Sequence, residues 1–477
     1  MKHLLGFCSA LLVAGCGSLP LQWPLAPVPQ QWQGSTQTGP QSLADRPWAE
    51  VLQVPELTAL IEEALRNNSD LAIAVERIEL ARAQVGIDRA ARYPTLRLDA
   101  SATRQRMPGA HPTINQISEG GTAGVSIPAW EIDLWGKLGD RAEAARRELL
   151  AQEALAQGVR ISLVAQVASL YLELIDLDNQ IAIAELTLES RRRALRLNQR
   201  RHEEGVSSII DVHQAESLLA GAEQTLADQR RRRGLSENGL SVLLGRLPGP
   251  ITRVQKLDDL PLPNSLLAGL PADLLLRRPD IVAAEESLRG AEASISAARK
   301  AYWPSITLST LVGFASPVLS QLFDSGRYAW SAQPGIGINL FDGGRTRFGI
   351  ERAESQQRIL VEQYKATIRQ AFREVNDQLL AFEQIEQQRA AAGRVAVSNR
   401  ARLKAANARY LSGVSNYFEV LDAERQLLDS EIALSQVTRT LHQSVVQLYR
   451  ALGGGWRKPA EEALEKMAND TSKSRHP

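Results

Sequence analysis

The chain has little of the material from which most chemical sites are built. Its 477 residues include two Cys, six His and three Met, too few for a thiolate cluster or a His-rich metal site. Neither sign of charge dominates, since 55 Lys and Arg face 54 Asp and Glu, and a nucleic-acid-binding protein normally carries a basic excess. Phosphate-binding P-loop and zinc-protease signatures are missing as well. We therefore predict no enzyme, no cofactor and no metal site.

Long apolar runs are also missing after the N-terminus. The richest segment, Ile161 to Leu177, is interrupted by Gln166, Glu173 and Asp176, so a membrane-spanning helix is not expected. Any crossing of a bilayer would have to use β-structure, because only helices and closed barrels satisfy their backbone groups in lipid. Hydrophobic residues nevertheless make up 44% of the chain, which excludes disorder throughout.

The first residues look like an export signal. A short basic start precedes an apolar run, Leu4 to Ala14, which is too short to span a bilayer and typical of a signal peptide. The sequence Val13 to Cys16 resembles the bacterial lipobox. That resemblance implies that residues 1–15 are removed and that acyl chains anchor Cys16 in the membrane. Gly17 stands where an Asp would retain a lipoprotein in the inner membrane, which favours the outer membrane. The alternative is an ordinary secretory signal.

The chain contains an internal duplication. Three blocks of sequence recur in the same order at a spacing of 206 to 210 residues, which is far too long for a solenoid repeat. The matched blocks begin at Ala90 and Lys300, at Ile132 and Ile338, and at Gly205 and Gly413. The spacing predicts two similar halves, residues 51–247 and 271–456, joined by a connector over 248–270.

Each half begins with the same pattern. A helix is expected over Pro55 to about Ala91, and again over Pro271 to about Ala301. Pro94 and Pro304 end these helices and begin extended segments in which apolar and polar residues alternate. A second extended run returns in each half, over residues 124–134 and 328–341. Each half is therefore expected to contain one β-hairpin.

A long helix hairpin follows the strands in each half. No Pro interrupts residues 140–204 or 343–411, and helices of this length reach nearly 100 Å. A Gly-Val-Ser break then precedes a helix that returns to about residue 244 or 452, as in an antiparallel coiled coil. The four predicted strands cannot close a barrel and would leave exposed edges. Three chains would supply twelve strands, enough to close one.

Taken together, the motifs resemble one family. They are Tyr93-Pro94, Trp303-Pro304, Leu340 to Gly344, Gly413 to Tyr417, Leu421 to Ala423 and Ala451 to Trp456. With the lipobox and the duplication, they look like the outer-membrane efflux protein (TolC-like) family, in its lipoprotein branch of resistance–nodulation–division (RND) systems. The resemblance implies a mainly α fold with a small β part. It implies a trimer with a twelve-stranded outer-membrane β-barrel, four strands per protomer, continuous with a long periplasmic α-helical barrel.

The same resemblance implies the remaining segments and the function. Residues 16–50 would form a lipidated equatorial segment together with the connector, and 457–477 a charged C-terminal tail. The protein would be a homotrimer in the outer membrane, lipid-anchored, with a long periplasmic extension. It would give drugs or other small toxic compounds a passive exit, with a periplasmic adaptor and an inner-membrane RND-type pump as partners. Alternatives are a conduit for ABC-driven export or metal efflux, or a lipid-anchored coiled-coil scaffold.

A gate is expected at the periplasmic ends of the helix hairpins. Carried over from the family, Phe418 would form an apolar constriction and Asp422 an acidic ring that attracts cations, with Arg425 nearby for a salt bridge. Their spacing of i, i+4 and i+7 puts all three on one helix face. Asp211 would hydrogen-bond Tyr410 and help to lock the closed state. The alternative is that these are ordinary solvated coiled-coil residues.

Overall fold

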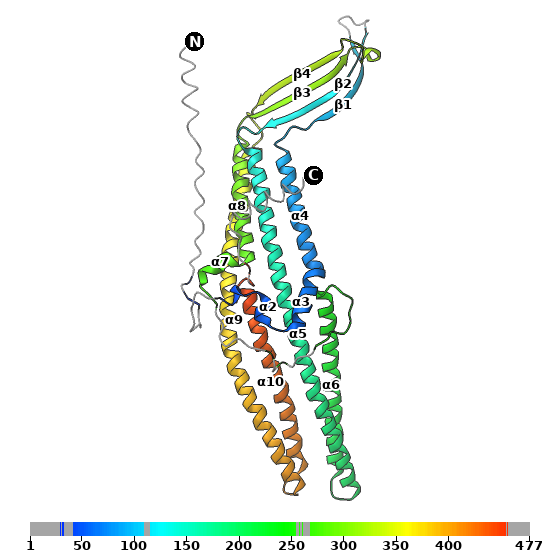
Figure 1. Cartoon of the computed structure of the whole chain (residues 1–477), viewed down its shortest axis with the longest axis vertical. Coiled ribbons are helices and arrows are strands. Elements are labelled where there is room, and N and C mark those ends of the chain that lie inside the picture. Colours follow the sequence, from blue (N-terminus) through cyan, green and yellow to red (C-terminus); the bar gives the residue numbers. More distant parts are fainter. Residues whose placement is uncertain are drawn as a thin grey trace.

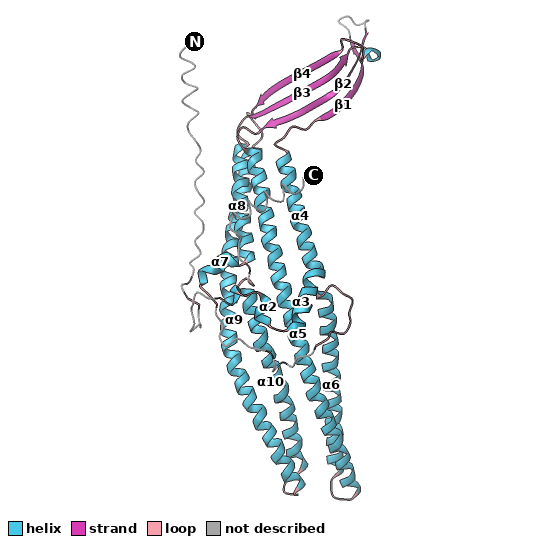
Figure 2. Cartoon of the chain, in the orientation of Figure 1, coloured by secondary structure: helices cyan, strands magenta, loops and turns pink. Residues whose placement is uncertain are grey.

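The structure is a computed structural model that describes residues 29, 31–32, 42–108, 115–253, 257, 260, 268–454 and 456. It is a long rod of helices with a curved sheet at one end (Figures 1 and 2). The helices are η1 (Leu43–Asp45), α2 (Trp48–Leu52), α3 (Pro55–Asn67), α4 (Ser69–Ala90), α5 (Lys137–Glu203), α6 (Ile209–Leu243), η3 (Pro271–Asp273), α7 (Leu274–Arg277), α8 (Pro279–Lys300), η4 (Leu319–Gln321), α9 (Arg345–Leu411) and α10 (Tyr417–Ala451). The strands are β1 (Arg97–Pro108), β2 (Asn115–Ile132), β3 (Ser305–Ser316) and β4 (Tyr328–Gly337).

The duplication in the sequence is a duplication of elements. Helices α5 and α9 each have 67 residues, and α6 and α10 each have 35. Both pairs are offset by 208 residues, from 137 to 345 and from 209 to 417. The shorter helices α4 and α8 each have 22 residues at an offset of 210. Every residue in one hairpin of long helices therefore has a counterpart 208 positions away in the other.

The helix expected at the start of each half is broken in both. Asn68 ends α3 and caps α4, because its side chain accepts a hydrogen bond from the Leu71 amide and donates one to the Leu243 carbonyl. In the second half, Arg278 has extended backbone angles, as expected before Pro279. The predictions of single helices over 55–91 and 271–301 are thus wrong at these two positions.

The helices form one curved layer, and the long helix α5 lies at its centre. Between the sheet and the middle of the rod, α5 packs against α4 and α8, and α8 packs against α9. In the far half, α5 packs against α6 and α10, and α10 packs against α9. Figure 1 shows α5 and α9 running almost the whole length of the rod. The layer is therefore one helix thick, with α9 at one side.

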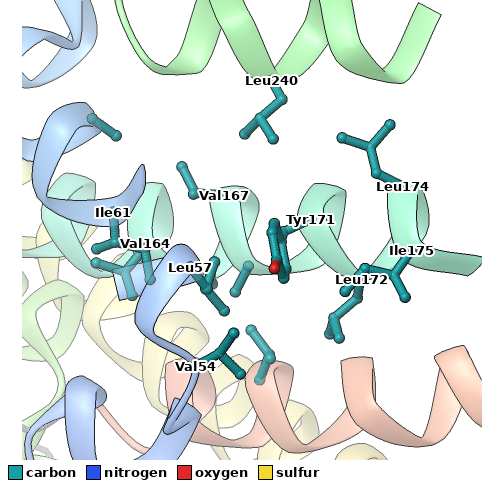
Figure 3. Close-up of a cluster of buried hydrophobic side chains, with 14 of the residues drawn as sticks. Val54, Leu57, Ile61, Val164, Val167, Tyr171, Leu172, Leu174, Ile175 and Leu240 are labelled. Carbon is teal, nitrogen blue, oxygen red and sulfur yellow. The ribbon is translucent and has the colours of Figure 1, made fainter. Parts of the chain in front are cut away.

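A hydrophobic core lies where the short helices meet α5. Ile61 of α3, Tyr171 and Leu174 of α5 and Leu240 of α6 are completely buried there, and Figure 3 shows their side chains between the helices. Burying such a side chain stabilises the fold by about 1.5–3 kcal/mol. Within the described residues, α5 is also the one helix with an 18-residue window apolar enough to pass as a membrane span, and the mean hydropathy of that window is 1.4. Half of that window is buried in the protein, as expected of a core helix.

The sheet joins the two halves. Its antiparallel order is β1-β2-β3-β4, so β2 of the first hairpin pairs with β3 of the second. The register places apolar residues in rows across all four strands. These rows include Leu98, Val125, Val312 and Trp330, and then Ala100, Ala123, Phe314 and Tyr328. A bulge between Ile127 and Trp130 shifts the alternation by one residue, which keeps Trp130 on the same apolar face.

The sheet is incomplete in a single chain. Strands β1 and β4 each have one neighbour in the described structure, so both outer edges are open. The apolar face is also uncovered, with Leu98 85% and Trp330 70% exposed. Native proteins rarely leave such edges unprotected, because open edges pair with other chains. This sheet therefore needs further strands and an apolar surrounding.

Candidate functional site

The two helix hairpins end in the same turn. Gly205 and Gly413 have left-handed φ angles of 74° and 72°, which only Gly adopts without strain. The Val206 amide donates to the Arg201 carbonyl at 2.7 Å, and the Val414 amide donates to the Arg409 carbonyl at 3.0 Å. These are Schellman-type helix ends. The Gly-Val-Ser sequence thus turns the chain back at the far end of the rod.

The helices that follow the two turns begin differently. Ser208 and Asp211 form a capping box at the start of α6, in which the Ser208 amide donates to the Asp211 carboxylate at 3.2 Å. At the start of α10, Asn416 makes no side-chain capping bond. The Asp211 carboxylate therefore accepts a hydrogen bond from the start of its own helix.

The predicted pairing of Asp422 with Arg425 is present, and two further partners join it. Arg425 donates to Oδ1 of Asp422 at 3.1 Å. Oδ2 accepts from Arg402 of α9 at 2.7 Å and from Gln426 at 2.8 Å. These bonds, that from Arg425 above all, lower the pKa of the Asp422 carboxyl below its ordinary value. We call Arg402, Asp422, Arg425 and Gln426 the Asp422 cluster.

Phe418 lies one turn before Asp422 on α10. The residue is 64% exposed, although an aromatic side chain of this size is normally more stable buried. The buried side of α10 is made by other residues, among them Tyr417, Val420 and Leu421. Phe418 and Asp422 therefore share the open side of the helix, as their spacing predicts.

Tyr410 has a different partner from the one expected. Its hydroxyl donates to Oδ1 of Asn198 on α5 at 3.2 Å, and no hydrogen bond to Asp211 is among those of the described residues. The Arg201 guanidinium lies 4.9 Å from the centre of the Tyr410 ring, within cation–π range. Burial raises the pKa of Tyr410 above its ordinary value. The expected contact between the hairpins is thus made by Asn198, since Asp211 caps α6.

A buried ion pair also joins the hairpins. Arg191 of α5 lies 2.9 Å from Glu424 of α10, with 4% and 10% of their side chains exposed. Burial is the main cause that raises the pKa of Glu424. Sequence reasoning missed this pair. The counterpart of Glu424 in the first half is Glu216, which lies at the surface beside His213. The repeated sequence therefore does not indicate that Glu424 is buried.

Several predicted features lie outside the described residues. Cys16 and the whole signal segment 1–15 are among them, as is the tail 457–477. Among the residues that the structure does describe, no three His, Cys, Asp or Glu side chains are grouped so that they could hold a metal ion.

Comparison with known proteins identifies the family. The model of the outer membrane efflux protein family matches residues 60–246 and 270–454, once in each half. The toluene efflux pump outer membrane protein TtgC of Pseudomonas putida is 34% identical over 485 residues, covering 99% of both chains. Outer membrane protein OprJ of Pseudomonas aeruginosa is 36% identical over 465 residues, covering 94% of this chain and 95% of OprJ.

Solved structures agree with the sequence comparison. The open state of the MtrE outer membrane channel of Neisseria gonorrhoeae superimposes with a TM-score of 0.83 at 30% identity, covering 91% of this chain and 97% of that one. The chain therefore belongs to the outer membrane efflux protein family and has the TolC-like fold. It is an outer-membrane channel component of an efflux system, which confirms the predicted function and the outer-membrane location.

Proposed function

We propose that three copies of this chain close one channel, with a twelve-stranded barrel in the outer membrane and a helical barrel in the periplasm. The observation that carries this proposal is the sheet, which has two open edges and an uncovered apolar face. Three such sheets joined edge to edge leave no free strand, and lipid covers the apolar rows. Sedimentation of the purified protein in mild detergent tests it: a trimer is expected, and a lone subunit contradicts the proposal.

The helices would form the periplasmic part of the duct. At 1.5 Å per residue, the 67 residues of α5 or α9 extend about 100 Å. The duct would be passive, so a periplasmic adaptor and an inner-membrane RND-type pump would supply the solute and the energy. Apolar side chains are exposed at the hairpin ends and would meet the adaptor. They are Val206, Ile209, Ile210 and Val414.

Small toxic compounds are the proposed cargo. The names of relatives specify toluene, solvent and antibiotic efflux. Deletion of the gene should increase susceptibility to solvents and antibiotics, and the wild-type chain should restore resistance. If susceptibility is unchanged and a secreted protein is lost, a conduit for ABC-driven export is favoured. If susceptibility is unchanged and metal tolerance is lost, a conduit for metal efflux is favoured.

The anchor and the division of the chain remain part of the proposal. Cleavage after residue 15 would free Cys16 for acylation. The mature chain would then consist of an N-terminal segment, a first repeat, a connector, a second repeat and a tail, over residues 16–50, 51–247, 248–270, 271–456 and 457–477. Cys16→Ser should abolish incorporation of labelled palmitate. Continued labelling of that variant would refute the lipobox.

The gate is proposed at the end of the second hairpin. Phe418 would narrow the pore there, while Asp422 and Arg425 would hold it shut. Tyr410 would lock the closed state through its hydrogen bond to Asn198 of α5. Asp211 would support this lock indirectly, because it caps the start of α6. The exposed position of Phe418 and the bonding of Asp422 to both α9 and α10 support this arrangement.

A further inference from the structure

The Asp422 cluster is present in one copy of the duplicated hairpin and missing from the other. The four residues that make it correspond, 208 positions earlier, to Ala194, Gln214, Ser217 and Leu218. The first hairpin has helices of the same lengths and the same turn without these charges. The helix lengths and the turn therefore do not depend on the cluster.

The cluster lies on the side of α10 that faces away from α5. Glu424, two residues beyond Asp422 and thus about 200° around the helix, reaches Arg191 of α5. Asp422 instead reaches Arg402 of α9. The side chains of Arg402 and Arg425 are 47% and 61% exposed, whereas that of Asp422 is only 24% exposed. The positive groups are thus the more accessible part of the cluster.

The cluster carries a net positive charge. Both oxygens of the single carboxylate already accept hydrogen bonds from the two guanidiniums. Each guanidinium has five N–H donors, so donors remain for a solute. Two neighbouring carboxylates are already paired, Glu419 with Arg409 at 3.3 Å and Glu424 with Arg191.

We infer that Arg402 determines the ion specificity of the channel by making the Asp422 level of the pore net positive. This inference depends on the proposed function, in which three copies surround one lumen. One Asp and two Arg from each chain give a charge of +3 at that level, in place of the −3 expected from three aspartates alone. Such a ring attracts small anions, from chloride to organic carboxylates, and repels cations.

Reversal potentials in planar bilayers under a KCl gradient test the inference. The wild-type channel should prefer chloride. Arg402→Gln should lower the chloride-to-potassium permeability ratio by roughly sevenfold, because one charge per subunit changes the local potential by about one thermal unit and acts oppositely on the two ions. Arg400→Gln is the matched control: it removes a charge two residues away, where Arg400 pairs with Glu431, and should change the ratio much less.

Two more variants complete the test. Arg402→Lys keeps the charge and should keep the preference for chloride, whereas Asp422→Asn should increase it. A cation-selective wild type, or a ratio that Arg402→Gln changes no more than Arg400→Gln does, overturns the inference. If Arg402→Gln does not assemble, an unchanged ratio in Asp422→Asn overturns it equally. A protein that forms no channel at all contradicts the proposed function, whereas a conducting channel with unaltered selectivity contradicts this inference alone.

Discussion

The two long hairpins have the same lengths and the same turn, yet their surroundings differ. Helix α5 has 22 buried residues, and its counterpart α9 has eight. The reason is position: α5 lies at the centre of the layer and packs against α3, α4, α6, α8 and α10, whereas the main neighbours of α9 are α8 and α10. Duplication thus copied the local structure, while the place in the layer decided which surfaces are buried.

Among the described residues, the contacts that hold the second hairpin to the first near its end include two polar pairs, Arg191–Glu424 and Tyr410–Asn198. The Arg201–Tyr410 cation–π contact and a small apolar cluster that includes Tyr417 and Val420 lie beside them. The large cores lie far from this end, near the middle of the rod. Movement of the second hairpin at this end would have to break these contacts but not the large cores, which suits the half that carries the proposed gate.

The largest expected effect compares two leucines 208 residues apart. Leu172 of α5 is 5% exposed and Leu380 of α9 is 56% exposed. Leu172→Ala should lower the free energy of unfolding by about 3 kcal/mol, because it leaves a cavity, while Leu380→Ala should change it by about 0.5 kcal/mol or less. Thermal unfolding of the two variants in detergent measures both. Equal losses would mean that another copy of the chain buries α9 as deeply as α5.

A smaller difference is expected for two glutamates at equivalent positions. Glu424→Gln leaves Arg191 buried without a countercharge and should cost about 2 kcal/mol. Glu216→Gln removes a partly exposed partner of His213 and should cost about 0.5 kcal/mol or less. The same unfolding measurement applies. A Glu424→Gln variant as stable as Glu216→Gln would show that the buried pair does not hold the hairpins together.

The proposed gate predicts a change in conductance rather than in stability. Asp422→Ala with Arg425→Ala should raise single-channel conductance roughly twofold or more, since the narrowest point dominates the resistance of a duct. The counterpart variant in the first hairpin, Gln214→Ala with Ser217→Ala, should leave conductance unchanged. If the Asp422 and Arg425 double variant conducts like the wild type, the gate assignment is wrong.

Sequence alone predicted most of the architecture. The repeat, the long helices and the Gly-Val-Ser turns follow from periodicity and from the places where Pro and Gly occur. The break at Asn68 was missed although Asn is a preferred capping residue and its bond from the Leu71 amide is local; only its second bond, to Leu243, lies far away in the sequence. The break before Pro279 did have a local signal, since a residue before Pro avoids helical angles.

The site was less predictable, for two different reasons. Arg402 could have been found by arithmetic: residues 402 and 422 are equidistant from 412 in the turn, so an antiparallel helix pair sets them opposite each other. Asn198 and Arg191 could not have been found in this way. Their partners lie in the other half of the chain, and the register between two hairpins depends on packing that no local pattern specifies.

The smallest expected effect is the dependence of gate opening on pH, through the protonation of Asp422. Arg425, Arg402 and Gln426 hold the pKa of Asp422 below its ordinary value of 3.8. A carboxyl with a lowered pKa contributes stability above its unfolded-state pKa and loses that contribution as the pH falls through the folded-state pKa. The contribution of Asp422 to closure should therefore persist down to pH 3.8 and be lost only below it, whereas Glu424, whose pKa burial raises, is protonated at a higher pH and acts alike in the wild type and in Asp422→Asn.

This titration distinguishes a neutralised carboxylate from an acidic ring. Three unpaired aspartates around one axis would repel one another and raise their pKa in the closed channel, so protonation would relieve the repulsion and conductance would fall, not rise, as the pH drops towards 3.8. Asp422→Asn removes this titrating group and should remove the step that depends on it, because an amide, like that of Gln214 at the equivalent position of the first hairpin, does not titrate. A step above pH 3.8 in the wild type that Asp422→Asn abolishes would contradict the pairing of Asp422 with Arg402 in the closed channel.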